Sequence, residues 1–78
     1  DLSNMVLTEQ LSSTDEVVDY LIARFLRVPP APESRAMIVR FLEDELGTSD
    51  IARAETYMED ALRMTLHLIM SQPEYQLS

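Results

Sequence analysis

His67 is the only histidine in the 78-residue chain, so it is the first residue to test for chemistry. A zinc site on a helix would need a second histidine or a carboxylate three or four residues away. The residues at those distances are Arg63, Met64, Met70 and Ser71. A lone histidine in such surroundings is far more often part of an ordinary core or surface than a metal ligand. We therefore predict no metal centre at His67.

An acidic run, Glu43 to Glu45, is the second candidate for chemistry, with Asp50 close behind it. Carboxylates near the end of a helix oppose the helix dipole, which favours a function such as cation binding. The alternating acids, central glycine and final glutamate of a calcium-binding loop are absent, however. Arg40 stands four residues before Asp44 and is expected to pair with it. The run is therefore interpreted as a solvated acidic face.

No other motif in the chain indicates catalysis. Gly47 is the single glycine, so there is no glycine-rich phosphate loop, and no serine lies in a Gly-x-Ser-x-Gly turn. The chain has no cysteine and so no thiolate site. Neither a catalytic residue nor a cofactor is predicted, and whether the chain takes part in an enzyme is left open.

The composition predicts one small, acidic, helical domain. The 14 acids outnumber the 6 bases, all of them arginine, and the net charge of −8 disfavours nucleic acid as a partner. No apolar run reaches the roughly 18 residues that a membrane span needs. The hydrophobic share of 46% is typical of a globular chain. Scarce glycine and frequent Leu, Met, Ala, Glu and Arg favour helices.

Two helices are predicted in the first two thirds of the chain. Ser13 and Glu16 have the spacing of a capping box, so a helix is expected over residues 14–27, ended by Pro29 and Pro30. A second helix is expected over residues 32–46, with Gly47 as its left-handed cap. The predicted buried stripes are Val17, Val18, Leu21, Ile22, Phe25 and Leu26 on the first helix, and Met37, Ile38, Phe41, Leu42 and Leu46 on the second.

A third and longer helix is predicted over residues 50–71, and its second half is apolar on nearly every side. Two short helices cannot cover all of these side chains. We therefore expect the end of this helix either to self-associate or to dock on the rest of a parent chain or on a protein partner. The candidate contact residues are Met64 and Leu68, which are four apart on one face, with Tyr75 and Leu77 in the tail. The alternative is that these residues are simply core.

The predicted architecture is all-α: a small three-helix bundle with an N-terminal lead-in and a short helical turn after Pro73. Residues 1–12 are expected to form an extended lead-in or linker that lays Met5, Val6 and Leu7 on the bundle, although a short helix fits the same apolar spacing. Residues 13–78 are expected to form the bundle domain. Because the chain begins with Asp1 and not with Met, it is interpreted as a processed product or an excised piece of a longer protein.

Two segments of the chain resemble segments of known protein families. Size, acidity and the segment Phe41-Leu-Glu-Asp-Glu-Leu-Gly47 are similar to acyl carrier proteins, but Thr48-Ser49-Asp50-Ile51 lacks their Asp-Ser-Leu order. The C-terminal His67-Leu-Ile-Met-Ser-Gln-Pro-Glu-Tyr-Gln-Leu77 instead resembles the closing signature of the bacterial domain-of-unknown-function family numbered eighteen hundred. Segments Glu16–Leu26 and Ser34–Leu42 fit the terminal helical region of that family. Only Pro73-Glu74-Tyr75-Gln76 is distinctive, and Gln72 replaces a small residue.

The second resemblance implies a helical region that closes a longer, mostly exported bacterial protein of unknown activity, with periplasmic or external localisation. It transfers no catalytic residue to these positions. Three hypotheses follow for function. The chain is a structural or interaction domain; or it is a non-catalytic wall of an active site that other residues complete; or it is a free-standing acidic adaptor for a basic protein partner.

Overall fold

The computed structural model of the chain describes residues 1–54 and 57–76. These residues form helices and no strand, as the all-α prediction requires. The helices in chain order are α1 (Leu2–Thr8), α2 (Thr14–Phe25), α3 (Pro32–Leu46), α4 (Ile51–Ala54), α5 (Met58–Met70) and α6 (Pro73–Gln76).

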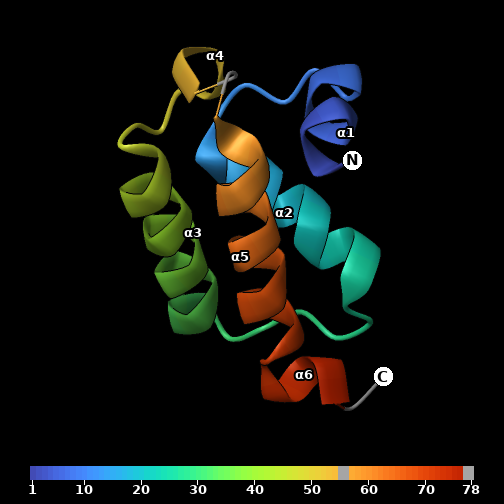
Figure 1. Cartoon of the computed structure of the whole chain (residues 1–78). Helices are drawn as coiled ribbons and strands as arrows, with labels where there is room; N and C mark the ends of the chain where they lie inside the picture. The colour runs from blue at the N-terminus through green and yellow to red at the C-terminus, as the bar shows by residue number, and fades with distance from the viewer. Residues whose placement is uncertain (55–56, 77–78) are drawn as a thin grey trace.

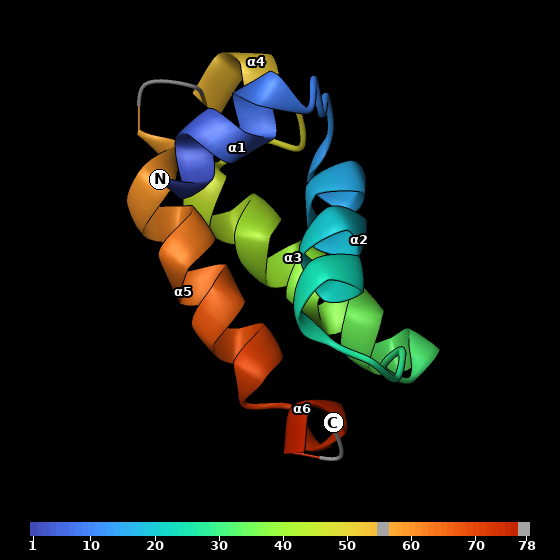
Figure 2. The same ribbon diagram turned by 90° about the vertical axis from the view of Figure 1, so that its right-hand side faces the viewer.

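Helices α2, α3 and α5 form the bundle, with α5 packed on both others (Figure 1). Helices α1 and α4 lie at one end of the bundle, and α6 lies at the other (Figure 2). The core consists of apolar side chains that these helices bury: Val6, Val17, Val18, Leu21, Ile22, Leu26, Ile38, Val39, Leu42, Leu46, Ile51, Ala54, Met58, Ala61, Leu62 and Ile69. The predicted small helical bundle is therefore confirmed.

The predicted start of α2 is confirmed, but the capping box is only half formed. The Ser13 side chain accepts a hydrogen bond from the Glu16 amide, as expected. The Glu16 carboxylate returns to the amide and hydroxyl of Ser12 rather than to Ser13, at 2.7 and 2.9 Å. These bonds from Ser12 lower the pKa of Glu16. The helix ends at Phe25, two residues before the predicted end, because Leu26 is already extended.

Helix α3 has the predicted bounds, and Gly47 caps it as predicted. Gly47 adopts φ 75° and its amide donates to the Glu43 carbonyl at 2.7 Å. Near the other end of α3, Arg35 donates to Asp19 at 2.7 Å and to Asp15 at 3.3 Å. The hydrogen bond from Arg35 lowers the pKa of Asp19. These contacts identify the Arg35 side of α3 as the side facing α2.

The single third helix predicted over residues 50–71 is wrong, because α4 and α5 are separate helices. Tyr57, directly before α5, has a non-helical backbone at φ −141° and ψ 25°. Its amide donates to Ala54 and its hydroxyl to the Leu46 carbonyl at 3.1 Å. At the other end of α4, the Ile51 amide donates to Ser12. The hydrogen bonds of Tyr57 and Ile51 thus go to α4, to the end of α3 and to the segment before α2. These contacts favour two separate helices over one straight helix.

The extended N-terminal lead-in is also wrong, because residues 2–8 form α1. Asp1 caps the helix by accepting from the Asn4 amide at 2.8 Å. Val6 is fully buried, and Leu2, Met5 and Leu11 pack against the core. Leu7, expected on the bundle, is 49% exposed. Residues 1–12 therefore belong to the folded body, through a helix that the same apolar spacing also allowed.

The predicted helical turn after Pro73 is confirmed as α6. The Ser71 hydroxyl donates to the Leu68 carbonyl at 2.7 Å. The Gln72 side chain donates to the same carbonyl at 2.9 Å. These two bonds close the C-terminal end of α5 and fix where α6 begins.

Candidate interaction surface

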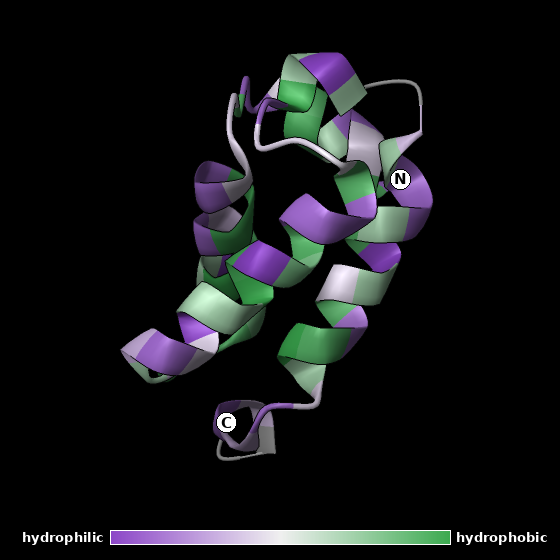
Figure 3. Cartoon of the chain, turned by 90° about the vertical axis from the view of Figure 1, so that its left-hand side faces the viewer, coloured by the Kyte–Doolittle hydropathy of each residue, from purple (hydrophilic) through white to green (hydrophobic). Residues whose placement is uncertain are grey.

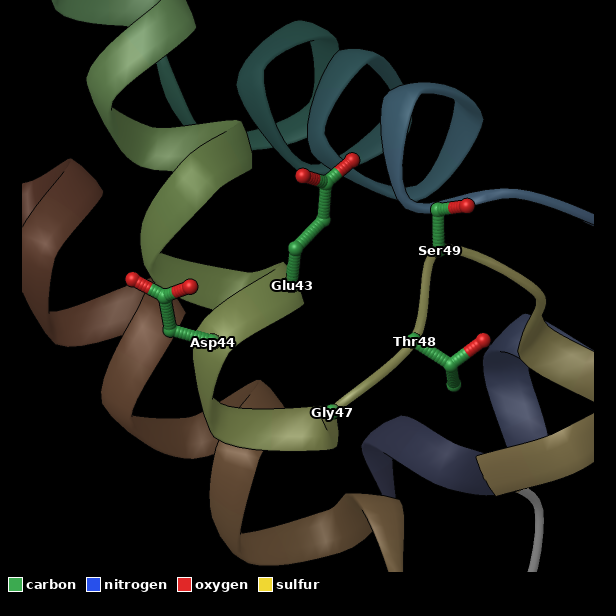
Figure 4. A pocket seen from close by; sticks show the side chains of 5 residues that line it. All are labelled: Glu43, Asp44, Gly47, Thr48 and Ser49. Atoms are coloured by element: carbon green, nitrogen blue, oxygen red, sulfur yellow. The ribbon is translucent and has the colours of Figure 1, made fainter.

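The acidic run lies beside a shallow hollow of about 350 Å³ at the turn after α3. Figure 4 shows that Glu43 and Asp44, both in its lining, point in different directions. Glu43 is half-buried and its Oε2 accepts from the hydroxyl of the buried Thr14 at 3.0 Å. Asp44 and Glu45 are exposed. The solvated-face interpretation is therefore confirmed for Asp44 and Glu45 and wrong for Glu43, which joins α3 to the start of α2.

The expected pair of Arg40 with Asp44 does not form: both are exposed, and neither is in any ion pair between described residues. His67 is exposed near the end of α5, with no acidic residue paired to it in that set. Over residues 1–54 and 57–76, no group of three or more His, Cys, Asp or Glu side chains is placed to hold a metal ion.

Glu59 has a structural role that sequence reasoning missed. It pairs with Arg63, four residues later on α5, at 3.0 Å, and its carboxylate also accepts from the amides of Ser3 at 2.8 Å and Leu2 at 3.4 Å. The bond from Ser3 is the main cause, with that from Arg63 second, of a pKa lowered to about 2. An anion from α5 thus binds the first amides of α1, where the helix dipole favours negative charge. The sequence separation of 56 residues left no local signal of this contact.

The contacts of α5 distinguish its two flanks. The flank with Glu59 is covered by α1. The flank with Met64 and Leu68 lies across the helix, roughly 140° or more from Glu59 at about 100° per residue. Tyr57, seven residues before Met64, is on the same side and donates its hydroxyl to Leu46 at the end of α3. The Met64 flank therefore faces α3.

Helix α3 has a corresponding flank. Arg35 and Glu43 mark the side that contacts α2, through their bonds to Asp19 and Thr14. Met37 and Phe41 lie four residues apart on the opposite side of α3. Both were predicted to be buried, yet Met37 is 41% exposed and Phe41 is half-buried. The prediction for the rest of that stripe, Ile38, Leu42 and Leu46, is confirmed.

Helices α3 and α5 pack together, and Figure 3 views the molecule from a side on which both are seen. The helical spacing of the two flanks predicts that they border one surface there. We call this surface the α3–α5 seam, defined by Met37, Phe41, Tyr57, Met64 and Leu68. Met37, Tyr57 and Met64 are 41%, 55% and 42% exposed, and Phe41 and Leu68 are half-buried. Exposed methionine and aromatic side chains of this kind are typical of adaptable protein-binding surfaces.

Only some of the predicted contact residues lie on the seam. Met64 and Leu68 share the seam, although Leu68 also packs against the core. Tyr75 is 38% exposed on α6, beyond the end of α5, and is not part of the seam. Leu77 lies outside the described residues. Met37 and Phe41 were missed because their helical spacing resembles that of a buried stripe.

Comparison with family models, with curated proteins and with solved structures finds no match to this chain. No helix within the described residues has the length and apolar character needed to cross a membrane. The candidate surface must therefore be interpreted from its own geometry.

Proposed function

We propose that this chain is a helical interaction domain that binds protein through the α3–α5 seam. The observation that carries the proposal is the exposure of Met37 on α3, of Met64 on α5 and of Tyr57 directly before α5. Grouped apolar exposure has more meaning than scattered single residues, because monomeric domains normally bury contiguous apolar surface. The carboxylates of Glu43 and Asp44, which line the hollow after α3, point in different directions, so that hollow does not favour a competing catalytic site.

The origin of the domain is part of the same proposal. The C-terminal block from His67 to Leu77 resembles the closing signature of a mostly exported bacterial family. We propose on that basis that the domain closes the C-terminus of a longer exported protein. Its binding partner is then either the rest of that parent chain or a separate protein.

Site-specific photo-crosslinking tests the proposal in cells that carry the natural gene. A photoreactive phenylalanine analogue replaces Met64 in one variant and Leu7, an exposed leucine on α1, in the control. We expect a discrete adduct from position 64 and none from position 7. Peptide mapping then assigns the adduct to the parent chain or to another protein. Equal adduct yields from the two positions, or none from position 64, would contradict the proposed surface.

A further inference from the structure

The rim of the α3–α5 seam is acidic. On α3, Glu33 lies four residues before Met37, and Asp44 and Glu45 lie three and four residues after Phe41. On α5, Asp60 lies four residues before Met64. All four of these acids are exposed. Among the described residues at these spacings on α3 and α5, the basic side chains are Arg40, three residues after Met37, and His67, three residues after Met64. Four carboxylates therefore border the seam against one guanidinium and one imidazole.

The rim acids are also available to a partner. Of the arginines, Arg35 pairs with Asp15 and Asp19, Arg53 with Asp50, and Arg63 with Glu59. None of these pairs includes a rim acid, and the rim acids have no other ion pair within the described residues. Their charge is therefore not neutralised by the chain, and a bound cation would not have to displace an existing contact.

From this arrangement we infer that the partner of the seam is a cationic amphipathic helix. Its apolar face would lie on the methionine and aromatic side chains of the seam, while lysine or arginine residues on its edges face the rim acids. Methionine suits such a surface because its flexible side chain adapts to the shape of a helix. The 13 residues of α5 span about 20 Å, so a partner helix of roughly 13 residues or more matches the seam in length.

A second copy of the chain is a poor occupant of the same surface. Each copy has a net charge of −8, and self-association through the seam would bring the acidic rims together. Like charges placed opposite one another oppose association. The same charge attracts a basic helix and speeds its encounter with the domain at low salt.

Because the inference rests on the proposed function, its test uses defined peptides with the whole chain rather than the natural partner. The first probe is an 18-residue amphipathic Leu/Lys helix labelled with a fluorophore. The second has the same pattern with Glu in place of every Lys, and the third has the Leu/Lys composition in a scrambled order. Fluorescence anisotropy measures each affinity at low and moderate salt.

We expect only the amphipathic Leu/Lys peptide to bind, and we expect binding to weaken as salt increases. Met64→Gln should weaken it about fivefold or more, whereas Leu7→Gln, at an equally exposed leucine on α1, should leave it within about twofold. Asp60→Asn should weaken it about two- to fivefold, whereas Glu9→Gln, at an exposed acid beyond α1, should have no comparable effect. Circular dichroism confirms that each variant folds.

The inference would be overturned if the amphipathic Leu/Lys peptide did not bind, or if the Glu or scrambled peptide bound equally well. It would also be overturned if Met64→Gln and Leu7→Gln had the same effect on binding. A wild-type dimer in light scattering that Met64→Gln dissociates would overturn it as well. The last result would assign the seam to a second copy. The photo-crosslinking experiment distinguishes failure of the inferred partner class from failure of the proposed function. An adduct at position 64 with a protein that has no basic amphipathic helix refutes the partner class and leaves the proposed function standing, whereas absence of any adduct refutes the proposed function.

Discussion

The two flanks of α5 face different surroundings, although both are rich in apolar side chains. One flank is covered by α1, whose Val6 is fully buried and whose first amides bind Glu59. On the other flank Tyr57 bonds to Leu46 at the end of α3, and Met64 remains 42% exposed. The difference shows that an N-terminal segment of seven helical residues is enough to close one side of the central helix. Nothing among the described residues covers the other side in the same way.

The difference between the flanks also concerns the kind of contact. The covered flank combines apolar burial with a charged cap, which together orient α1 on α5. The open flank has adaptable side chains bordered by acids that form no ion pair with the residues that the structure describes. The covered flank stabilises the fold, whereas the open flank remains available to bind another molecule.

The largest expected effect comes from Leu62, which lies between the two flanks and is fully buried. Leu62→Ala should lower the free energy of unfolding by about 2–5 kcal/mol, because it removes apolar contacts and leaves a cavity at the centre of the bundle. Urea unfolding followed by circular dichroism measures the change. A loss below about 1 kcal/mol would mean that α5 does not pack on the core as described.

The covered flank is tested next by Val6→Ala. Val6 is fully buried, so the loss of two methyl groups should cost about 1–2 kcal/mol if α1 is docked. Leu7→Ala on the exposed side of the same helix is the matched control and should change stability by less than about 0.5 kcal/mol. Equal effects of the two substitutions would show that α1 has no fixed face towards α5.

Glu59 gives the charged part of that flank a test of its own. Glu59→Gln should destabilise the chain by about 1 kcal/mol, because it removes the anion that binds the Ser3 and Leu2 amides. The pKa of Glu59, about 2, lies below the ordinary glutamate value of 4.5, so the folded state favours the charged form. The stabilisation is therefore complete above pH 4.5 and lost as the pH falls towards 2.

Denaturant titrations at pH 6 and at about pH 2.5 measure this dependence. The stability difference between wild type and Glu59→Gln should shrink as the carboxylate is protonated. Acids elsewhere, including Asp19 and Glu16 with their lowered pKa values, also contribute to acid unfolding, but their contribution is present in both proteins. A difference that stays constant with pH would rule out the charged cap.

Local signals in the sequence predicted most of the bundle and none of its long-range polar contacts. Proline and glycine at the ends of α3 specify its bounds, and the buried positions of α2 follow from one apolar stripe. The break at Tyr57 was missed because Ile51, Ala54 and Met58 keep helical spacing across it, and all three are buried. Helical periodicity reports which side chains are buried, and it does not require that one continuous helix buries them.

The candidate surface shows the same limit in another form. Met37 and Phe41 have the spacing of core residues, and only the position of α5 determines how far they are covered. Met64 was assigned to an exposed face because the second half of the helix had more apolar side chains than its neighbours could cover. An excess of apolar side chains on one helix predicts that some of them stay uncovered, as Met64 does. The sequence has no such excess on α3 to indicate that Met37 is exposed.

The smallest expected effect on stability is at the open flank, and it decides between a binding surface and a core. Met64→Glu should change the free energy of unfolding by less than about 0.5 kcal/mol, because the side chain is already 42% exposed and a glutamate there can reach water. Its new charge would lie near Asp60, four residues earlier, so a slight destabilisation is expected at low salt and should fade as salt is added.

Met58→Glu is the matched control: Met58 is 1% exposed on the buried side of the same helix, and a charge there should unfold the chain. Light scattering and circular dichroism on the three proteins measure mass and helicity together. If Met64→Glu unfolds the chain as Met58→Glu does, Met64 is interior, both flanks of α5 are closed, and the α3–α5 seam is part of the core rather than a surface for a partner.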